Sequence, residues 1–231
     1  MENTAVWTRS LHYSYGRQAA VRGVDLEVPR GSIYGFLGPN GAGKTSIIRL
    51  LLGQLRPDAG EIELFGKPLA ASLPSILGRV GALVERASCY PQLSALDNIE
   101  IIRRMRGLPR HESDRALEIS GLVEEAGRPV KTFSLGMRQR LGLAQAMLGQ
   151  PELLILDEPS NGLDPLGMRE MRELIRSLPS RWGVTVFMSS HILSEIDQVA
   201  THLCLIKKGK LVFQGKVERL EQDVPGSSLE D

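Results

Sequence analysis

The stretch from Gly38 to Thr45 constrains this chain more than any other part of the sequence. It reads GPNGAGKT, which fits the pattern of a glycine, four further residues, a second glycine, a lysine and a serine or threonine. The apolar run 33–37 precedes it, and a helical pattern over 45–52 follows it. Glycines let a backbone wrap closely with its N–H groups turned inward, and a helix N-terminus adds about half a positive charge. The stretch therefore predicts a loop that cradles phosphate groups.

Two side chains of this loop have chemical roles that follow from the pattern. Lys44 would neutralise the β- and γ-phosphates of a nucleotide, and the Thr45 hydroxyl would bind Mg²⁺. A plain glycine-rich turn is the alternative, but every fixed position and both flanking elements fit a phosphate site. The predicted nucleotide-binding residues of the loop are Gly38, Pro39, Asn40, Gly41, Ala42, Gly43, Lys44, Thr45 and Ser46.

A second apolar run, 153–156, ends in two carboxylates, Asp157 and Glu158. Strands that end in acids are common in α/β proteins, so this run alone would say little. Beside a phosphate loop it indicates a metal-dependent nucleotide site. Asp157 would hold Mg²⁺, directly or through water, and Glu158 would orient an attacking water molecule.

The first third of the chain is predicted to consist mainly of strands, and strands and helices are predicted to alternate in the last third. Strand–helix–strand alternation in the last third favours a mostly parallel sheet. The expected strands are 5–11, 24–28, 33–37, 61–65, 153–156, 184–188 and 202–206, and the expected helices are 45–52, 166–178 and 192–199.

The middle of the chain is helical instead. Helices are expected over 94–107, 112–125 and 135–148, with a weak point at Gly121 in the second. Ser94 followed by Asp97 resembles a capping box at the start of the first helix. The block from about 86 to 150 therefore looks like a subdomain inserted into an α/β core.

These patterns predict an α/β fold: a P-loop NTPase core with a mostly parallel sheet, an N-terminal antiparallel β-subdomain and an inserted α-helical subdomain. One domain would span 1–220, and the Gly/Ser/acidic end, 221–231, would fray. No apolar run approaches the roughly 18 residues of a membrane span, and the first residues show no secretory signal. The two cysteines, Cys89 and Cys204, form no CxxC pair, which argues against a zinc site or a disulfide framework.

Four further motifs resemble those of the nucleotide-binding subunit of ABC transporters, and they occur in that family's order. Tyr15 stands where the family has an aromatic residue that stacks on adenine, and FSLGM at 133–137 matches the place of its LSGGQ signature. SNGLD at 160–164 resembles the D-loop, and His191 stands at the switch histidine. The resemblance covers about residues 15–215, and motifs in this order do not arise by coincidence.

The resemblance implies a composite site shared by two subunits. The signature of one chain would close on the ATP held by the phosphate loop of another, with Asp164 acting across the dimer. One chain carries the complete set of motifs, which permits the homodimer that we expect and leaves a heterodimer of ATPase subunits as the alternative. The implied catalytic residues are Glu158, His191 and Lys44, and the implied signature residues are Ser134, Leu135, Gly136 and Met137.

The chain departs from the usual family pattern after the run 80–84, where Glu85 replaces the expected glutamine. Gln92 competes for this role but lies too far past the strand. The stretch 81–100 is similar to the bacitracin and lantibiotic self-protection exporters, which carry glutamate here. We expect Glu85 to contact Mg²⁺ and to report ATP binding to a membrane partner, although an exposed acid is the plain alternative.

What the resemblance implies for function is an ATP-hydrolysing motor that exports a peptide-type antibiotic or other hydrophobic drug through a separate membrane permease. The chain would be cytoplasmic and peripheral on the inner face of the membrane, and residues 87–96 would contact the permease. The alternative is an ABC-type ATPase that acts on nucleic acid or the ribosome. A net charge of only +1 and the short helical segment between Lys44 and Ser134 disfavour that alternative. A GTPase is disfavoured because no NKxD motif occurs.

Overall fold

The central sheet has six strands in the order β11-β10-β4-β9-β8-β7. The computed structural model describes residues 3–85 and 87–218. Strands β10, β4, β9, β8 and β7 are parallel, and only β11 runs antiparallel, beside β10. The mostly parallel sheet is thus confirmed. The strands are β4 (Ile33–Leu37), β7 (Val80–Leu83), β8 (Leu153–Asp157), β9 (Thr185–Ser190), β10 (His202–Lys207) and β11 (Lys210–Lys216).

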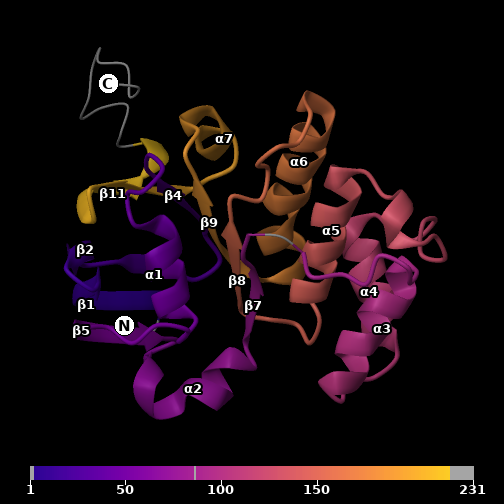
Figure 1. Cartoon of the computed structure of the whole chain (residues 1–231), viewed down its shortest axis with the longest axis horizontal. Coiled ribbons are helices and arrows are strands. Elements are labelled where there is room, and N and C mark those ends of the chain that lie inside the picture. The colour runs from indigo at the N-terminus through magenta and orange to yellow at the C-terminus, as the bar shows by residue number, and fades with distance from the viewer. Residues whose placement is uncertain (1–2, 86, 219–231) are drawn as a thin grey trace.

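The middle strands β4, β8 and β9 are buried along their whole length. Such strands read as continuous apolar runs because helices cover both faces of a parallel sheet. Ile47 and Ile48 of α1 (Lys44–Leu51) belong to the apolar cluster on one side, and Met171 and Ile175 of α6 (Pro165–Trp182) belong to the cluster on the other. Because the strands are parallel, their carboxyl ends meet at one edge of the sheet, and β4, β9 and β8 lie side by side there (Figure 1).

A second, antiparallel sheet contains the N-terminal strands in the order β2-β1-β5-β6, with β3 paired to β1. The expected continuous strand 24–28 is wrong, because Asp25 and Leu26 belong to no strand and interrupt it between β2 and β3, which both run antiparallel to β1. The Thr8 hydroxyl donates to the Val24 carbonyl and accepts from the Leu26 N–H, each at 2.9 Å, and so bridges the break between two strands. The strands of this sheet are β1 (Thr4–Tyr15), β2 (Gln18–Val24), β3 (Glu27–Pro29), β5 (Ala59–Leu64) and β6 (Lys67–Pro68).

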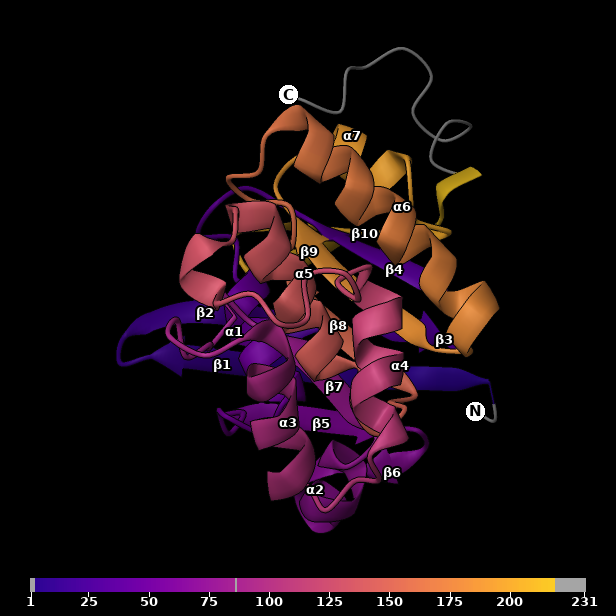
Figure 2. The same cartoon turned by 90° about the vertical axis from the view of Figure 1, so that its right-hand side faces the viewer.

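The helical lobe consists of α3 (Ala95–Met105), α4 (His111–Ser120), the short 3-10 helix η1 (Val130–Thr132) and α5 (Leu135–Ala146), packed around their own apolar cluster. Figure 2 shows α3 and α4 in front, away from the antiparallel sheet. The predicted capping box is present, with Ser94 Oγ accepting from the Asp97 N–H at 3.0 Å. The second helix is shorter than expected, because Gly121 adopts φ 63° and ends it after Ser120.

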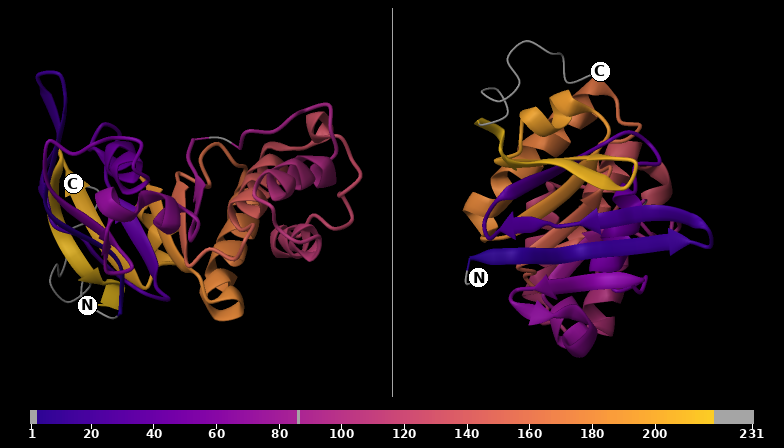
Figure 3. Two further views of the ribbon diagram at one scale, coloured as in Figure 1. Left: turned by 90° about the horizontal axis from the view of Figure 1, so that it is seen from below. Right: turned by 90° about the vertical axis from the view of Figure 1, so that its left-hand side faces the viewer.

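The remaining helices differ from expectation mainly at their ends. Helix α6 runs past the predicted residue 178 to Trp182, where Gly183 ends it in a left-handed conformation. Helix α7 (Leu193–Asp197) is shorter than the predicted 192–199, and α2 (Leu69–Leu77) was not predicted. The antiparallel sheet and the helical lobe lie at opposite ends of the molecule (Figure 3). None of the helices within the described ranges is long and apolar enough to cross a membrane, and the predicted tail 221–231 lies outside the described residues.

Candidate functional site

A cavity of about 610 Å³ opens where the antiparallel sheet meets the carboxyl edge of the central sheet. The phosphate loop forms one wall, and Tyr15 and Ala20 of the β1–β2 hairpin form another. Glu158 and His191 line the side that the ends of β8 and β9 provide. The structure therefore gathers residues from separate parts of the chain at a single cavity.

The phosphate loop joins the end of β4 to the start of α1. Gly43 needs to be glycine, because it has φ 105° and an added Cβ would lie 2.5 Å from the Ala20 carbonyl oxygen. No side chain caps α1 and no acidic residue lies in its first turn. The first N–H groups of the helix are therefore free to bind an anion, as the sequence predicts.

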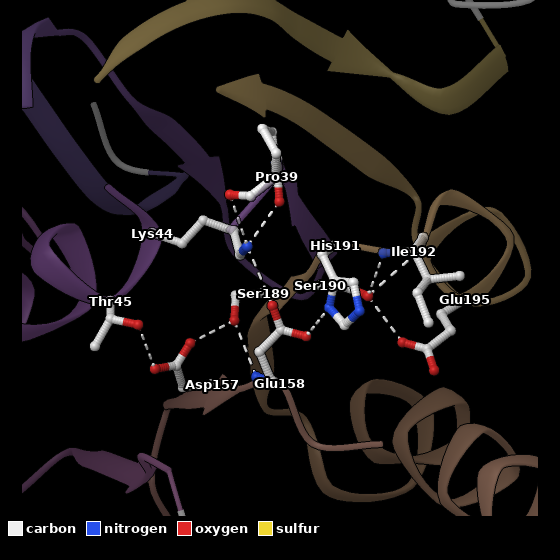
Figure 4. Close-up of polar contacts among 11 residues, drawn as sticks. Pro39, Lys44, Thr45, Asp157, Glu158, Ser189, Ser190, His191, Ile192 and Glu195 are labelled. Carbon is white, nitrogen blue, oxygen red and sulfur yellow. Dashed lines mark hydrogen bonds and ion pairs between the residues drawn. The ribbon is translucent and has the colours of Figure 1, made fainter. Parts of the chain in front are cut away.

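Lys44 is buried and three groups hold its ammonium group. It donates to the carbonyl oxygens of Gly38, at 2.7 Å, and Pro39, at 3.4 Å. Its Nζ also lies 3.1 Å from Glu158 Oε1 (Figure 4). The ammonium group is thus positioned at the floor of the cavity, where it can exchange one carboxylate for a phosphate.

The hydroxyl of Thr45 donates to Asp157 Oδ2 at 2.9 Å. Asp157 is only 4% exposed, and its other carboxylate oxygen accepts from the Ser189 hydroxyl at 2.6 Å. The described residues contain no cluster of three or more His, Cys, Asp or Glu side chains that could hold a metal by themselves. One hydroxyl and one carboxylate suit Mg²⁺, which protein sites usually bind through one or two carboxylates together with substrate phosphates.

Ser189 also accepts from the Glu158 N–H, at 2.9 Å, and so orders both acids at the end of β8. The sequence analysis did not identify this serine. The feature of the sequence that could have identified it is its position, directly after the predicted strand 184–188 and two residues before His191. The register that pairs Asp157 with Ser189 brings them together.

Glu158 bridges Lys44 and His191 across the cavity. Its Oε2 lies 2.7 Å from His191 Nδ1, while its Oε1 faces Lys44 (Figure 4). The loop that carries His191 is held by Ser190, whose hydroxyl donates to Glu195 at 2.8 Å and accepts from the Ile192 N–H at 3.0 Å. A carboxylate so placed can accept a proton from a water molecule, and the histidine keeps it oriented.

Tyr15 lies at the mouth of the cavity and is 46% exposed. Its ring contacts Tyr13 edge to face, with the centroids 4.9 Å apart, and its hydroxyl lies 3.5 Å from Ser46 Oγ. An exposed aromatic ring that neighbours support in this way suits stacking against a planar base.

The predicted signature residues do not line this cavity. Ser134 is exposed and caps α5 in the helical lobe, where its Oγ accepts from the Met137 N–H at 3.2 Å. Asp164 caps α6 by accepting from the Gly167 N–H at 2.9 Å. The two segments are close to each other, since a Cβ on Gly162 would lie 3.3 Å from Leu135 Cδ2. They therefore form a second surface beside the nucleotide cavity, and of the two segments only SNGLD reaches the cavity lining, through Asn161.

Glu85 also lies apart from the residues that line the cavity. Its carboxylate pairs with Arg49 of α1 at 2.7 Å, and its side chain is 65% exposed. Its backbone has φ 64°, which non-glycine residues seldom adopt. Of the three residues predicted to bind Mg²⁺, the structure thus brings Thr45 and Asp157 together, whereas Glu85 is paired with the Arg49 guanidinium group.

The proteins that this chain is similar to are ATP-binding proteins, in agreement with the geometry of the site. The sequence profile of the ABC transporter family matches residues 21–161. The bacitracin transport ATP-binding protein BcrA of Bacillus licheniformis is 47% identical over 95% of this chain and 72% of its own length. The lantibiotic transport ATP-binding protein SrtF of Streptococcus pyogenes is 39% identical over 92% of this chain and 91% of its own. Among solved structures, cbiO1 from Clostridium perfringens, part of the ABC transporter complex cbiONQ, superposes with a TM-score of 0.88 at 24% identity, covering 96% of this chain and 92% of that one.

Proposed function

Because the chain belongs to the ABC transporter family, we propose that it is the ATP-hydrolysing subunit that drives export of a peptide-type antibiotic or other hydrophobic drug. The observation that carries the proposal is the bridge from Lys44 through Glu158 to His191, beside the Thr45–Asp157 pair. The relatives BcrA and SrtF are named as bacitracin and lantibiotic transport proteins, which supports this class of cargo.

ATP binding begins with an exchange of partners at Lys44. The triphosphate replaces the Glu158 carboxylate on the ammonium group, and the N–H groups at the start of α1 bind phosphate oxygens. Tyr15 stacks on the adenine at the mouth of the cavity. Thr45 and Asp157 would hold Mg²⁺, which would supply positive charge to neutralise the charge that develops on the phosphates.

The same exchange frees Glu158 for hydrolysis. Its carboxylate accepts a proton from a water molecule, whose oxygen attacks the γ-phosphorus as the bond to the β-phosphate oxygen breaks. His191 Nδ1 remains on Glu158, so the other ring nitrogen can contact the γ-phosphate. Catalysis then consists mainly of positioning and charge stabilisation.

A second copy of the chain completes the site. Ser134 and Gly136 lie outside the chain's own cavity, so their contacts with nucleotide require the cavity of a neighbour, most simply in a homodimer. Asp164 acts at the same junction, because its segment packs against the signature.

A membrane permease is the other proposed partner, with the chain peripheral on the cytoplasmic face of the membrane. Tyr90 and Leu93 supply exposed apolar surface in the segment 87–96, being 61% and 36% exposed. Glu85 lies just before this segment, and its release from Arg49 would let the carboxylate reach the metal. Glu85 would in this way link nucleotide binding to the permease.

Co-purification from native membranes tests the proposal. A tagged E158Q variant, loaded with ATP and Mg²⁺, should retain an integral membrane protein that mass spectrometry identifies. The K44A variant is the matched control and should retain much less, since it lacks the phosphate contact. Ribosomes or DNA in place of a membrane protein would reject the transporter assignment.

A further inference from the structure

The hairpin between β10 and β11 closes one side of the nucleotide cavity, although the sequence analysis assigned it no role. Its turn residues Lys208 and Gly209 both line the cavity. The Gly209 N–H donates to the Ala42 carbonyl at 2.9 Å, and its own carbonyl accepts from the Arg22 N–H at 2.8 Å. The turn is therefore fixed to the phosphate loop on one side and to β2 on the other.

Lys208 has a backbone conformation that its residue type disfavours. Its φ is 51° and that of Gly209 is 76°, and Lys207 pairs directly with Lys210. A two-residue hairpin turn with two positive φ angles favours asparagine or glycine at its first central position. Strained residues that are not glycine persist only where the surrounding structure holds them, and they cluster at ligand-binding and active sites.

The side chain of Lys208 offers the cavity a positive charge that no acid neutralises. Across residues 3–85 and 87–218, no ion pair includes Lys208 or Arg22, and both residues line the cavity. Lys44, in contrast, is already paired with Glu158. A cavity with uncompensated cations attracts a polyanion such as a nucleoside triphosphate.

We propose that Lys208 is a further nucleotide-binding residue, whose ammonium group contacts the phosphate chain of ATP in addition to Lys44. The inference rests on the proposed function, since it requires a nucleotide in this cavity. It accounts for a lysine where asparagine would suit the turn better, because asparagine carries no charge for the phosphates.

Titration calorimetry of the full chain with ATP, in the absence of Mg²⁺, tests the proposal. The K208N variant should bind ATP about fivefold more weakly, which is the effect of losing one partly exposed charge interaction. Its melting temperature should rise by about 2 °C, because asparagine fits the turn. K208Q should lose the same affinity without the gain in stability, and K208R should keep the wild-type affinity.

The matched control is K210N, which removes an equal charge from the same turn but outside the cavity lining. Unchanged ATP affinity in K208N and K208Q, or an equal loss in K210N, would overturn the proposal. Slower hydrolysis with unchanged affinity would also overturn it, because Lys208 would then act on another subunit. The K44A variant distinguishes failure of the proposed function from failure of the role of Lys208. If K44A binds ATP with wild-type affinity, the proposed function fails. If K44A loses affinity but the Lys208 variants do not, only the role of Lys208 is rejected.

Discussion

The phosphate loop and the signature segment are both predicted to contact nucleotide, yet they are built in opposite ways. Lys44 and Asp157 are 6% and 4% exposed, and several neighbours fix each side chain in place. Ser134 and Leu135 are exposed, and the Ser134 hydroxyl accepts only from its own helix among the described residues. The phosphate half of the site is therefore built within one chain, whereas the signature half is the part that we propose to serve a neighbour. Changes in the signature half should therefore affect ATP hydrolysis without affecting ATP binding by the isolated chain.

The largest effect is expected from Glu158→Gln, within the phosphate half. The amide keeps the shape of the side chain but cannot accept a proton from water, so hydrolysis should fall by about 10²- to 10⁴-fold. ATP binding should persist, and an ATP-dependent dimer should appear in gel filtration, with phosphate release as the assay for turnover. E173Q, an exposed change on α6, is the control. If E158Q hydrolysed ATP at the wild-type rate, Glu158 would not be the base.

A smaller loss is expected from Ser134→Ala, within the signature half. Loss of a contact to the γ-phosphate should slow hydrolysis at saturating ATP by about 10²-fold, while the isolated chain binds ATP as before. Calorimetry and phosphate release measure the two quantities.

The control for this variant is S94A, because Ser94 caps another helix of the same lobe. Both variants should lose about 1 kcal/mol of stability from the missing cap. Only S134A should lose hydrolysis, and equal losses of activity would show that helix capping, rather than nucleotide contact, is the role of Ser134.

The helical lobe, which carries the signature half, contains a buried carboxylate, that of Glu112. The stability of this lobe gives a third test of the comparison. Burial alone would raise the pKa of Glu112, but bonds from Arg115, Gln150 and the Gly149 N–H lower that pKa to about 2. Because the folded pKa lies below the unfolded value of about 4.3, the stabilisation is fully present above pH 5 and is lost as the pH falls toward 2.

Glu112→Gln should therefore lower the free energy of unfolding by about 2–3 kcal/mol at pH 7 and by much less near pH 2. Urea denaturation at the two pH values measures this difference. E125Q, which removes an exposed partner of Arg128, should change stability by less than about 0.5 kcal/mol. A wild-type pH profile in E112Q would show that Glu112 does not hold the lobe in place.

The smallest effect on stability is expected from Glu85→Ala, between the two halves. Its pair with Arg49 is well exposed, so its loss should cost less than about 0.5 kcal/mol. If the carboxylate reaches the metal during turnover, the Mg²⁺ concentration required for hydrolysis should rise and transport should weaken. E61A, a change at another exposed acid, is the control. Wild-type hydrolysis and transport in E85A would end the proposed link to the permease.

Several features of the fold and site were predictable because a few adjacent residues specify them. The pattern of the phosphate loop, the two acids after 153–156 and the capping box at Ser94 each carry their own local geometry. Helix α2 was missed for the same local reason: Pro74 and the non-helical Ser72 interrupt its periodicity.

What only the tertiary structure decided depends on residues far apart in the chain. The Thr8 hydroxyl bridges the break between β2 and β3. Ser189 orders Asp157 and Glu158 because the register between β8 and β9 places it beside them. The turn that carries Lys208 lies against the phosphate loop, through the bond from Gly209 to Ala42, because β10 lies beside β4 in the sheet. Propensity and loop geometry act over a few residues, so the sequence alone determines which groups can bind a nucleotide. Strand order and register act over the whole chain, and they determine which distant side chains complete the site.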